Sequence, residues 1–436
     1  NAGTQVTALI NDADGSGITF DKTPPYFNET TAQGAGAITI SSNNSDNTVA
    51  VLGDVVTLSL TSTEAIKAGS DPTVTINGNN ATVTRNSTTT FTATYTMSST
   101  DGSSNIDAIP FVISDYEDVA GNAGATVNNS TTDGTSIKYD PIRPTLSNIV
   151  MVSDNSNSAY AKQGDEIQLT FESSETINTP TITMLGSADG VTVAANGTNA
   201  WKATRTIIGG DAETGVAFTV SFSDPAGNTG SNGSGGAVVT ATSSGSVVMV
   251  DRTGPTITTV DIATDNDLPQ YAVPADIVTL TIIANEAIQT PTVTIMQNSA
   301  PTVEDVDGFD NKKWTATHTA GNAETVGTVP FSIDALDLAG NANTAGQITS
   351  IDGLNDSDGS NVTYDNTAPT LSNITFTSNN TINSAYAKNN DIVTVEFEAD
   401  EQLLESTVSV IINAAGTADV ATVNKSSDWD GVTEGW

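Results

Sequence analysis

The sequence predicts an all-β protein built as a tandem array of β-sandwich modules. A 12-residue signature recurs in four variants, and its leading residues Asp54, Asp165, Asp276 and Asp391 lie 111, 111 and 115 residues apart. A Glu follows ten residues after each of them. Self-similarity at a nearly fixed spacing indicates a tandem array, and no segment shows the apolar spacing of a helix.

In each copy, the first strand that the pattern identifies comes directly after the leading Asp. In the first copy Val56, Leu58 and Leu60 alternate with polar residues, and a period of two is typical of a strand with one buried face. The corresponding triplets are Ile167, Leu169 and Phe171; Val278, Leu280 and Ile282; and Val393, Val395 and Phe397. We therefore expect these side chains to form the core.

Further strands follow in a fixed order. A second strand is expected at Pro72, Pro180, Pro291 and Ser406. A third carries an aromatic residue that we expect to fill the core: Phe91, Trp201, Trp314 or Trp436. A fourth runs into an Asp-x-Ala-Gly-Asn turn at 118–122, 224–228 and 337–341. About seven short strands per copy, separated by turns, indicate a β-sandwich.

Linkers that contain proline separate the copies. Proline fixes φ and removes a hydrogen-bond donor, so it ends a sheet and stiffens the connection, and joints this short predict a rod. The linkers begin at Asp21, Asp140, Asp251 and Asp365. The expected organisation is the C-terminal strands of a preceding module in 1–21, whole modules in 22–140, 141–251 and 252–365, and the N-terminal part of a further module in 366–436.

The two ends of the chain match different parts of the repeat. The segment from Asn1 aligns with the segment from Asn122, and Trp436 aligns with Trp314. Neither end piece can bury a whole core by itself. We expect the missing parts to come from continuation of the same chain or from copies of it.

The composition narrows the classes of partner. The 436 residues include 51 Asp and Glu against 13 Lys and Arg, a formal charge of −38. Nucleic acid and anionic membranes need a positive surface, so we expect no contact with either, whereas cations are favoured. Cysteine is absent, which excludes disulfides and thiolate sites. No apolar run approaches the roughly 20 residues that span a bilayer.

The repeated motifs resemble the bacterial-type Ig-like repeats of large prokaryotic (bacterial and archaeal) cell-surface proteins. The motifs are the Asp-x-Thr-x-Pro-Thr linker, the signature after the leading Asp, the Trp-x-Ala-Thr strand and the Asp-x-Ala-Gly-Asn turn. The resemblance implies immunoglobulin-like sandwiches, an extracellular location at the cell surface, and often calcium at the joints. The repeat spacing gives each sandwich about 111–119 residues. The linkers depart from the pattern at Tyr26 and Ile142, which weakens the inference at those two joints.

Acidic residues should converge at one end of each sandwich. In an immunoglobulin-like sandwich the incoming linker, the B–C loop and the F–G loop lie at the same end. The expected sets are Asp21, Glu64 and Asp118; Asp140, Glu175 and Asp224; Asp251, Glu286 and Asp337; and Asp365 with Glu401, which lack an F–G partner. Calcium binds six to eight oxygens and fits such a set. The alternative is that each linker Asp and turn Asp only caps backbone amides.

Asn-x-Ser/Thr sequons are numerous, and glycans are therefore possible partners. The better candidates for glycosylation are Asn28, Asn80, Asn86, Asn196 and Asn361. Abundant Asn, Ser and Thr explain many such matches without any glycan.

The sequence offers little for catalysis, and we expect no enzyme. His318 is the only histidine and takes the position of Tyr95 and Arg205, so we interpret it as a variable surface residue. We expect a structural protein, an extracellular fibril or adhesin stalk with calcium-stiffened joints. The alternative is a surface-layer lattice protein. A carbohydrate-binding accessory array is a more distant alternative, because it needs exposed aromatic residues at equivalent positions and the sequence shows none.

Overall fold

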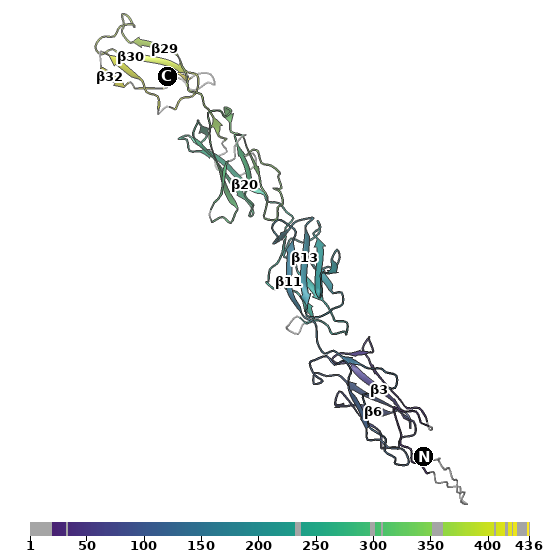
Figure 1. Cartoon of the computed structure of the whole chain (residues 1–436). Helices are drawn as coiled ribbons and strands as arrows, with labels where there is room; N and C mark the ends of the chain where they lie inside the picture. The colour runs from purple at the N-terminus through teal and green to yellow at the C-terminus, as the bar shows by residue number, and fades with distance from the viewer. Residues whose placement is uncertain are drawn as a thin grey trace, which may run out of the picture. The chain divides into compact units, whose positions relative to one another are not determined.

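The computed structural model describes residues 20–31, 34–231, 237–296, 301–306, 308–350, 361–404, 407–414, 417–420, 422–424 and 434–435. These residues form strands and turns, with no α-helix among them (Figure 1). Contacts divide the chain into a first unit, Asn1–Thr253 with Leu338–Asn341, and a second unit, Gly254–Asp337 with Ala342–Trp436. The predicted all-β fold is confirmed. Within the described part of the chain, no helix is long and apolar enough to cross a membrane.

The first sandwich has the strand order of an immunoglobulin domain, A-B-E-D on one sheet and C-F-G on the other. One sheet has the order β1 (Ala37–Ser42), β3 (Val55–Thr61), β7 (Thr90–Thr96), β6 (Thr82–Arg85). The facing sheet has the order β5 (Asn79–Asn80), β4 (Thr73–Ile76), β8 (Phe111–Ser114), β9 (Val127–Asn128). A short parallel pair, β2 (Val49–Ala50) with β10 (Lys138–Tyr139), closes it.

The second sandwich repeats this order. One sheet contains β11 (Leu146–Ser153), β13 (Glu166–Ser173), β16 (Ala200–Thr206) and β15 (Thr192–Ala195). The other contains β14 (Thr181–Met184), β17 (Phe218–Ser221) and β18 (Val238–Val239). The parallel pair is β12 (Tyr160–Ala161) with β19 (Met249–Val250).

The third sandwich lies in the second unit and again follows the same order. Its first sheet contains β20 (Ile257–Thr264), β22 (Ile277–Ala284), β25 (Lys313–Thr319) and β24 (Thr302–Asp305). β23 (Thr292–Ile295) pairs with β27 (Phe331–Asp334). β28 (Thr363–Tyr364) pairs in parallel with β21 (Tyr271–Ala272) and antiparallel with β26 (Gly327–Thr328).

The last strands form a smaller set. β29 (Leu371–Ser378) pairs with β30 (Val393–Ala399), which also pairs with β33 (Glu434–Gly435), while β31 (Ile411–Ala414) and β32 (Thr417–Val420) make a hairpin. The expectation of a strand that begins at Ser406 is wrong for the described residues 407–410, which form no strand. In the other sandwiches this strand pairs with strand F, and the described residues here include no strand F. The expectations for 1–19 and for Trp436 lie outside the described residues.

Three cores fill the three sandwiches, as the period-two pattern predicts. Val56, Leu58 and Leu60 are at most 1% exposed, and Phe91 on the neighbouring β7 is also buried. Trp314 is buried, whereas Trp201 is partly buried at the edge of its core. Burying one such side chain contributes about 1.5–3 kcal/mol, so these strands are held mainly by their apolar faces.

The Asp-x-Ala-Gly-Asn turn closes on itself. In the first sandwich the Asp118 N–H donates to Asn122 O at 3.1 Å, and the Gly121 N–H donates to Asp118 O at 3.1 Å. Gly121 has a φ of 92° and Gly227, its counterpart in the second sandwich, 100°. A side chain rarely adopts such values, which accounts for glycine in the motif.

Candidate metal centre

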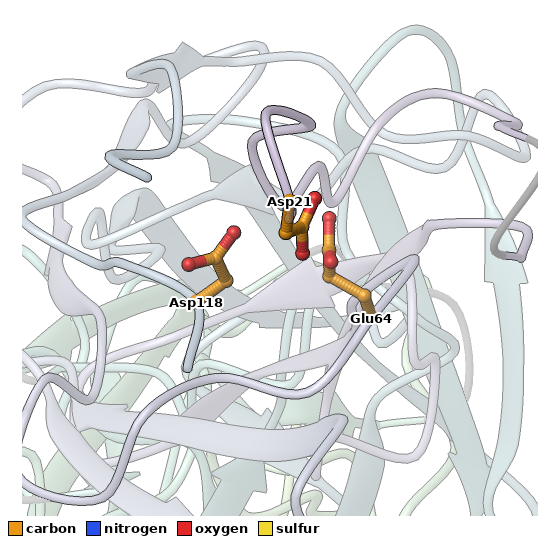
Figure 2. A group of neighbouring side chains, drawn as sticks. All are labelled: Asp21, Glu64 and Asp118. Atoms are coloured by element: carbon orange, nitrogen blue, oxygen red, sulfur yellow. The ribbon is translucent and has the colours of Figure 1, made fainter. Parts of the chain in front are cut away.

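The first acidic set is Asp21, Glu64 and Asp118, and the structure brings its three carboxyl groups together. Asp21 lies in the linker, Glu64 follows β3 and Asp118 follows β8. One carboxylate oxygen from each residue lies within 4.8 Å of those of the other two. Figure 2 shows the carboxyl group of Glu64 next to that of Asp21, with Asp118 beside them. The linker and two loops of one sandwich end therefore meet at a single acidic site.

The second acidic set is Asp140, Glu175 and Asp224, and it repeats this geometry within the first unit. Its carboxylate oxygens also lie within 4.8 Å of one another. Asp224 is 1% exposed, as is Asp118 in the first set. Two copies of one arrangement indicate that the sequence repeat specifies it.

The last residue of the turn fixes the turn Asp. Asn228 donates from its backbone N–H to Asp224 Oδ1 at 2.8 Å and from Nδ2 to Asp224 Oδ2 at 2.9 Å. Its Nδ2 also donates to Asp140 O at 3.0 Å. Asn122 makes the same two bonds to Asp118. Sequence reasoning missed this role, although the Asn recurs in all three turns.

Both linker aspartates cap a backbone amide two residues later. Asp21 Oδ1 accepts from the Thr23 N–H at 2.9 Å, and Asp140 Oδ1 accepts from the Ile142 N–H at 3.0 Å. Because the backbone provides this donor, Ile142 makes the same cap as Thr23. Capping thus accounts for the turn Asp and for one oxygen of the linker Asp in each set.

Capping does not account for the Glu of either set. Glu64 Oε1 and Glu175 Oε1 are buried and have no hydrogen-bond partner among the described residues. A buried polar atom without a partner costs about 1–3 kcal/mol, and more where the group is charged. Both atoms belong to residues of the acidic sets, so they are the part of the arrangement that a cation would complete.

Burial and the neighbouring charges in the two sets disfavour ionisation of the glutamates. Burial, followed by the negative charges of Asp21 and Asp118, raises the pKa of Glu64 to about 7. Burial and the charges of Asp140 and Asp224 likewise raise the pKa of Glu175. Three carboxylates this close need either a proton or a cation. All the donor atoms are oxygens, as calcium prefers, and neither nitrogen nor sulfur belongs to the set.

The residues of the third predicted set belong to different units: Asp251 to the first, and Glu286 and Asp337 to the second. In the first unit Asp251 Oδ1 accepts from the Thr253 N–H at 3.3 Å, and Asp251 O accepts from Asn341 Nδ2 at 3.0 Å. In the second unit Asp337 is 1% exposed, and Glu286 is half-buried.

The fourth predicted pair lies in the second unit. Asp365 Oδ1 accepts from the Thr367 N–H at 2.9 Å and from Thr367 Oγ1 at 2.5 Å, which lowers the pKa of Asp365. Burial, followed by the charge of Asp365, raises the pKa of Glu401. The linker Asp and the Glu therefore influence each other here too.

The glycosylation candidates are all on the surface. Asn28, Asn80, Asn86, Asn196 and Asn361 are exposed. Asn86 Nδ2 donates to Thr92 Oγ1 at 2.7 Å, so its amide is partly engaged.

His318 occupies a variable position, as predicted, but its side chain is half-buried and less exposed than the interpretation as a surface residue implies. Its side chain is 17% exposed, and its Nε2 lies 3.2 Å from Glu324 Oε1. In the first sandwich the hydroxyl of Tyr95 donates to the buried Asp101, and in the second Arg205 pairs with the buried Asp211. The acid follows six residues after its partner in every case, a signal that the sequence analysis overlooked. The residue at this position differs between the sandwiches, and in each of them it contacts an acid that is buried or half-buried.

Among solved structures, the chain is similar to tandem immunoglobulin domains. The I-band fragment I67-I69 from titin is 11% identical, with 80% of this chain and 100% of that chain covered and a TM-score of 0.33. Titin domains A168-A170 are 12% identical, with 74% of this chain and 96% of that chain covered and a TM-score of 0.28. The mouse nectin-like molecule 4 ectodomain is 12% identical, with 71% of this chain and 97% of that chain covered and a TM-score of 0.25. No protein-family description and no curated protein matches the chain. At scores this low the fold class rests on the strand order: the chain is a tandem array of Ig-like sandwiches.

Proposed function

We propose that this chain is a non-enzymatic structural protein of the cell surface, the shaft of an extracellular fibril or the stalk of an adhesin, with joints stiffened by calcium. Its modules are residues 22–140, 141–251 and 252–365, flanked by partial modules. The observation that carries the proposal is the buried, unpartnered oxygen of Glu64 and of Glu175, each inside a set of three carboxylates.

Calcium bound at such a set would tie a linker to the sandwich that follows it. In the second set Asp140 belongs to the linker, whereas Glu175 and Asp224 come from two loops of the second sandwich. One ion shared by the three would remove freedom from the linker and neutralise their repulsion. By sequence equivalence alone, the proposal extends to Asp251, Glu286 and Asp337, and to Asp365 with Glu401.

The test is thermal unfolding of the full chain with calcium and with chelator. A ligand that binds only the folded state stabilises by about 3–4 kcal/mol at roughly 100–1,000 times its dissociation constant. The double variant Glu64→Gln, Glu175→Gln should lose the part of this response that comes from the first two acidic sets, while Glu304→Gln, an exposed residue outside the sets, should keep all of it. An unchanged Tm after chelation of the parent protein would refute the calcium proposal.

One observation favours a second candidate, the carbohydrate-binding array. The expectation of no exposed aromatic residues at equivalent positions is wrong, because a Tyr lies five residues before three of the four leading Asp residues. Tyr271 is 40% and Tyr386 is 71% exposed, and Tyr160 is half-buried. Sedimentation with insoluble polysaccharides tests this candidate, and loss of binding in Tyr271→Ala, Tyr386→Ala would support it.

For a lattice protein, electron microscopy of the purified assembly should show sheets in place of filaments.

A further inference from the structure

The leading Asp of the signature takes no part in the acidic sets, yet it recurs in every copy. In the first sandwich Asp54 Oδ2 accepts from Asn44 Nδ2 at 2.8 Å and from the Val51 N–H at 2.8 Å. In the second, Asp165 Oδ2 accepts from Asn155 Nδ2 at 2.6 Å and from the Lys162 N–H at 2.9 Å. The Asp therefore fixes the side-chain amide of an Asn ten residues earlier.

The fixed Asn contacts a turn that is distant in sequence. Asn44 Nδ2 also donates to Ala226 O at 3.0 Å, and Ala226 lies in the Asp224–Asn228 turn of the second sandwich. Asn155 Nδ2 donates to Ala339 O at 2.7 Å, and Ala339 occupies the same place in the next turn. Both contacts lie within the first unit. The same bond at the same turn position, made twice, is a repeated interface and not an isolated contact.

The Asn amide is oriented before it meets the turn. Its oxygen is also engaged, because Asn44 Oδ1 accepts from the Asp46 N–H at 3.1 Å. The turn approaches closely as well: a Cβ at Gly227 would lie 3.8 Å from Asn44 Nδ2. A preoriented donor loses little freedom on binding, so the surface is suited to one partner shape, the backbone of an Asp-x-Ala-Gly-Asn turn.

The same turn contributes to the second acidic set. Asp224 supplies its buried carboxylate, and Asn228 ties that carboxylate to the linker at Asp140. Two residues away, Ala226 O is held by Asn44 of the preceding sandwich. Contact with the preceding sandwich and the geometry of the acidic set therefore depend on one five-residue segment.

We propose that the pairs Asn44–Asp54 and Asn155–Asp165 are a docking surface for the Asp-x-Ala-Gly-Asn turn of a following module of this kind, and that docking and calcium binding strengthen each other. The second part rests on the proposed function. If docking orders the turn for the ion, the ion must favour docking by the same factor, because coupling between two binding events is reciprocal. Asn44 is thus a positioning residue for the second acidic set without being a ligand.

Docking can be tested without calcium. The chain has no cysteine, so Ser87→Cys and Ser244→Cys, both at exposed positions, allow spin labels on the first and second sandwiches of the full chain. In chelator, Asn44→Ala should broaden the distance distribution between the labels. Asn266→Ala is the matched control. Asn266 Nδ2 donates to Asp276 Oδ2 at 2.8 Å in the third sandwich, so this variant loses the same local bond away from this joint. Equal distributions in the parent and Asn44→Ala would overturn the docking surface.

Coupling is tested by calorimetric titration of calcium into the full chain carrying Glu64→Gln, Glu286→Gln and Glu401→Gln, which leaves the second acidic set as the only proposed site with its Glu. Adding Asn44→Ala should weaken calcium binding about 3- to 10-fold, the effect of one hydrogen bond, and adding Asn266→Ala should leave it unchanged. Unchanged affinity with Asn44→Ala would overturn the coupling while the calcium proposal stands. If the starting protein binds no calcium, the proposed function and the coupling both fail, and the distance measurement alone decides on docking.

Discussion

Asn228 and Asp224 form a closed pair: the backbone N–H and the side-chain amide of the Asn donate to the two oxygens of the Asp, at 2.8 and 2.9 Å. Asp224 is 1% exposed, so water cannot replace these bonds. Its negative charge is held in place by neutral donors, which leaves the site able to attract a cation.

We therefore expect Asn228→Ala to destabilise the second sandwich. The substitution removes the side-chain donor to a buried carboxylate, which costs about 1–3 kcal/mol. Chemical denaturation of the full chain measures the change. Asn196→Ala, in an exposed turn, is the control and should stay within about 0.5 kcal/mol of the parent. Equal midpoints for the two variants would contradict the role assigned to Asn228.

The pH dependence of stability should reverse when calcium is added. The pKa of Glu64 is raised from 4.5 to about 7 by folding, so the folded state holds a proton that the unfolded state has released. In chelator this contribution to stability is complete below about pH 4.5 and is lost as the pH rises through about 7. With calcium, which displaces the proton, stability should instead increase over the same interval.

Melting temperatures between pH 5 and pH 8 test this, with Glu64→Gln as the control. In chelator the control should lose less stability than the parent as pH rises, because it lacks the titrating group. If the parent shows the same pH slope with and without calcium, the ion does not bind at these carboxylates.

Chelation should also loosen the joint that contains the second acidic set. Without a cation the charges of Asp140, Glu175 and Asp224 repel one another, so the linker should sample more orientations. Small-angle scattering of the full chain should show a changed maximum dimension after chelation. The double variant Asp140→Asn, Glu175→Gln should respond less than the parent, and a response equal to that of the parent would exclude this set as the cause.

The buried pairs on the third strand should differ in their contribution to stability. Arg205 and Asp211 are each 8% exposed, so Arg205→Met leaves a buried charge unpaired and should cost about 3–5 kcal/mol. Tyr95→Phe removes one neutral donor to Asp101, which also accepts from Asn79 Nδ2 at 2.7 Å, and should cost about 1–3 kcal/mol. Denaturation of the two variants compares these values, and a smaller loss for Arg205→Met would contradict the argument.

The local sequence pattern predicted the strands of the three sandwiches well. The alternation of Val56, Leu58 and Leu60 reports which side of a strand is buried, and that information lies within a few residues. The approach of Asp21, Glu64 and Asp118 could also be anticipated, because the fold brings their loops to one end. In both cases the same residues recur in the sequence because each sandwich needs the same local structure.

The contacts between distant segments could not be predicted in this way. Asn44 and Ala226 are 182 residues apart in sequence, and neither belongs to a strand pattern. The burial of Glu64 Oε1 without a partner depends on the packing of segments distant in sequence, which no spacing reveals. The pairing of Arg205 with Asp211 was available as a fixed six-residue spacing but was overlooked, because residues of three different types occupy the first position.

The parallel pairing of β2 with β10 determines how a sandwich responds to force. The Lys138 N–H donates to Thr48 O and the Asp140 N–H to Ala50 O, each at 2.9 Å. Tension along the chain pulls β2 toward the N-terminus of the chain and β10 toward the C-terminus. Both hydrogen bonds are therefore loaded together in shear. Two strands sheared past each other must break their bonds at the same time, whereas strands that peel apart break them one by one. The same pairing recurs in β12 with β19 and in β21 with β28, so each sandwich resists stretching at the segment that leads into the next linker.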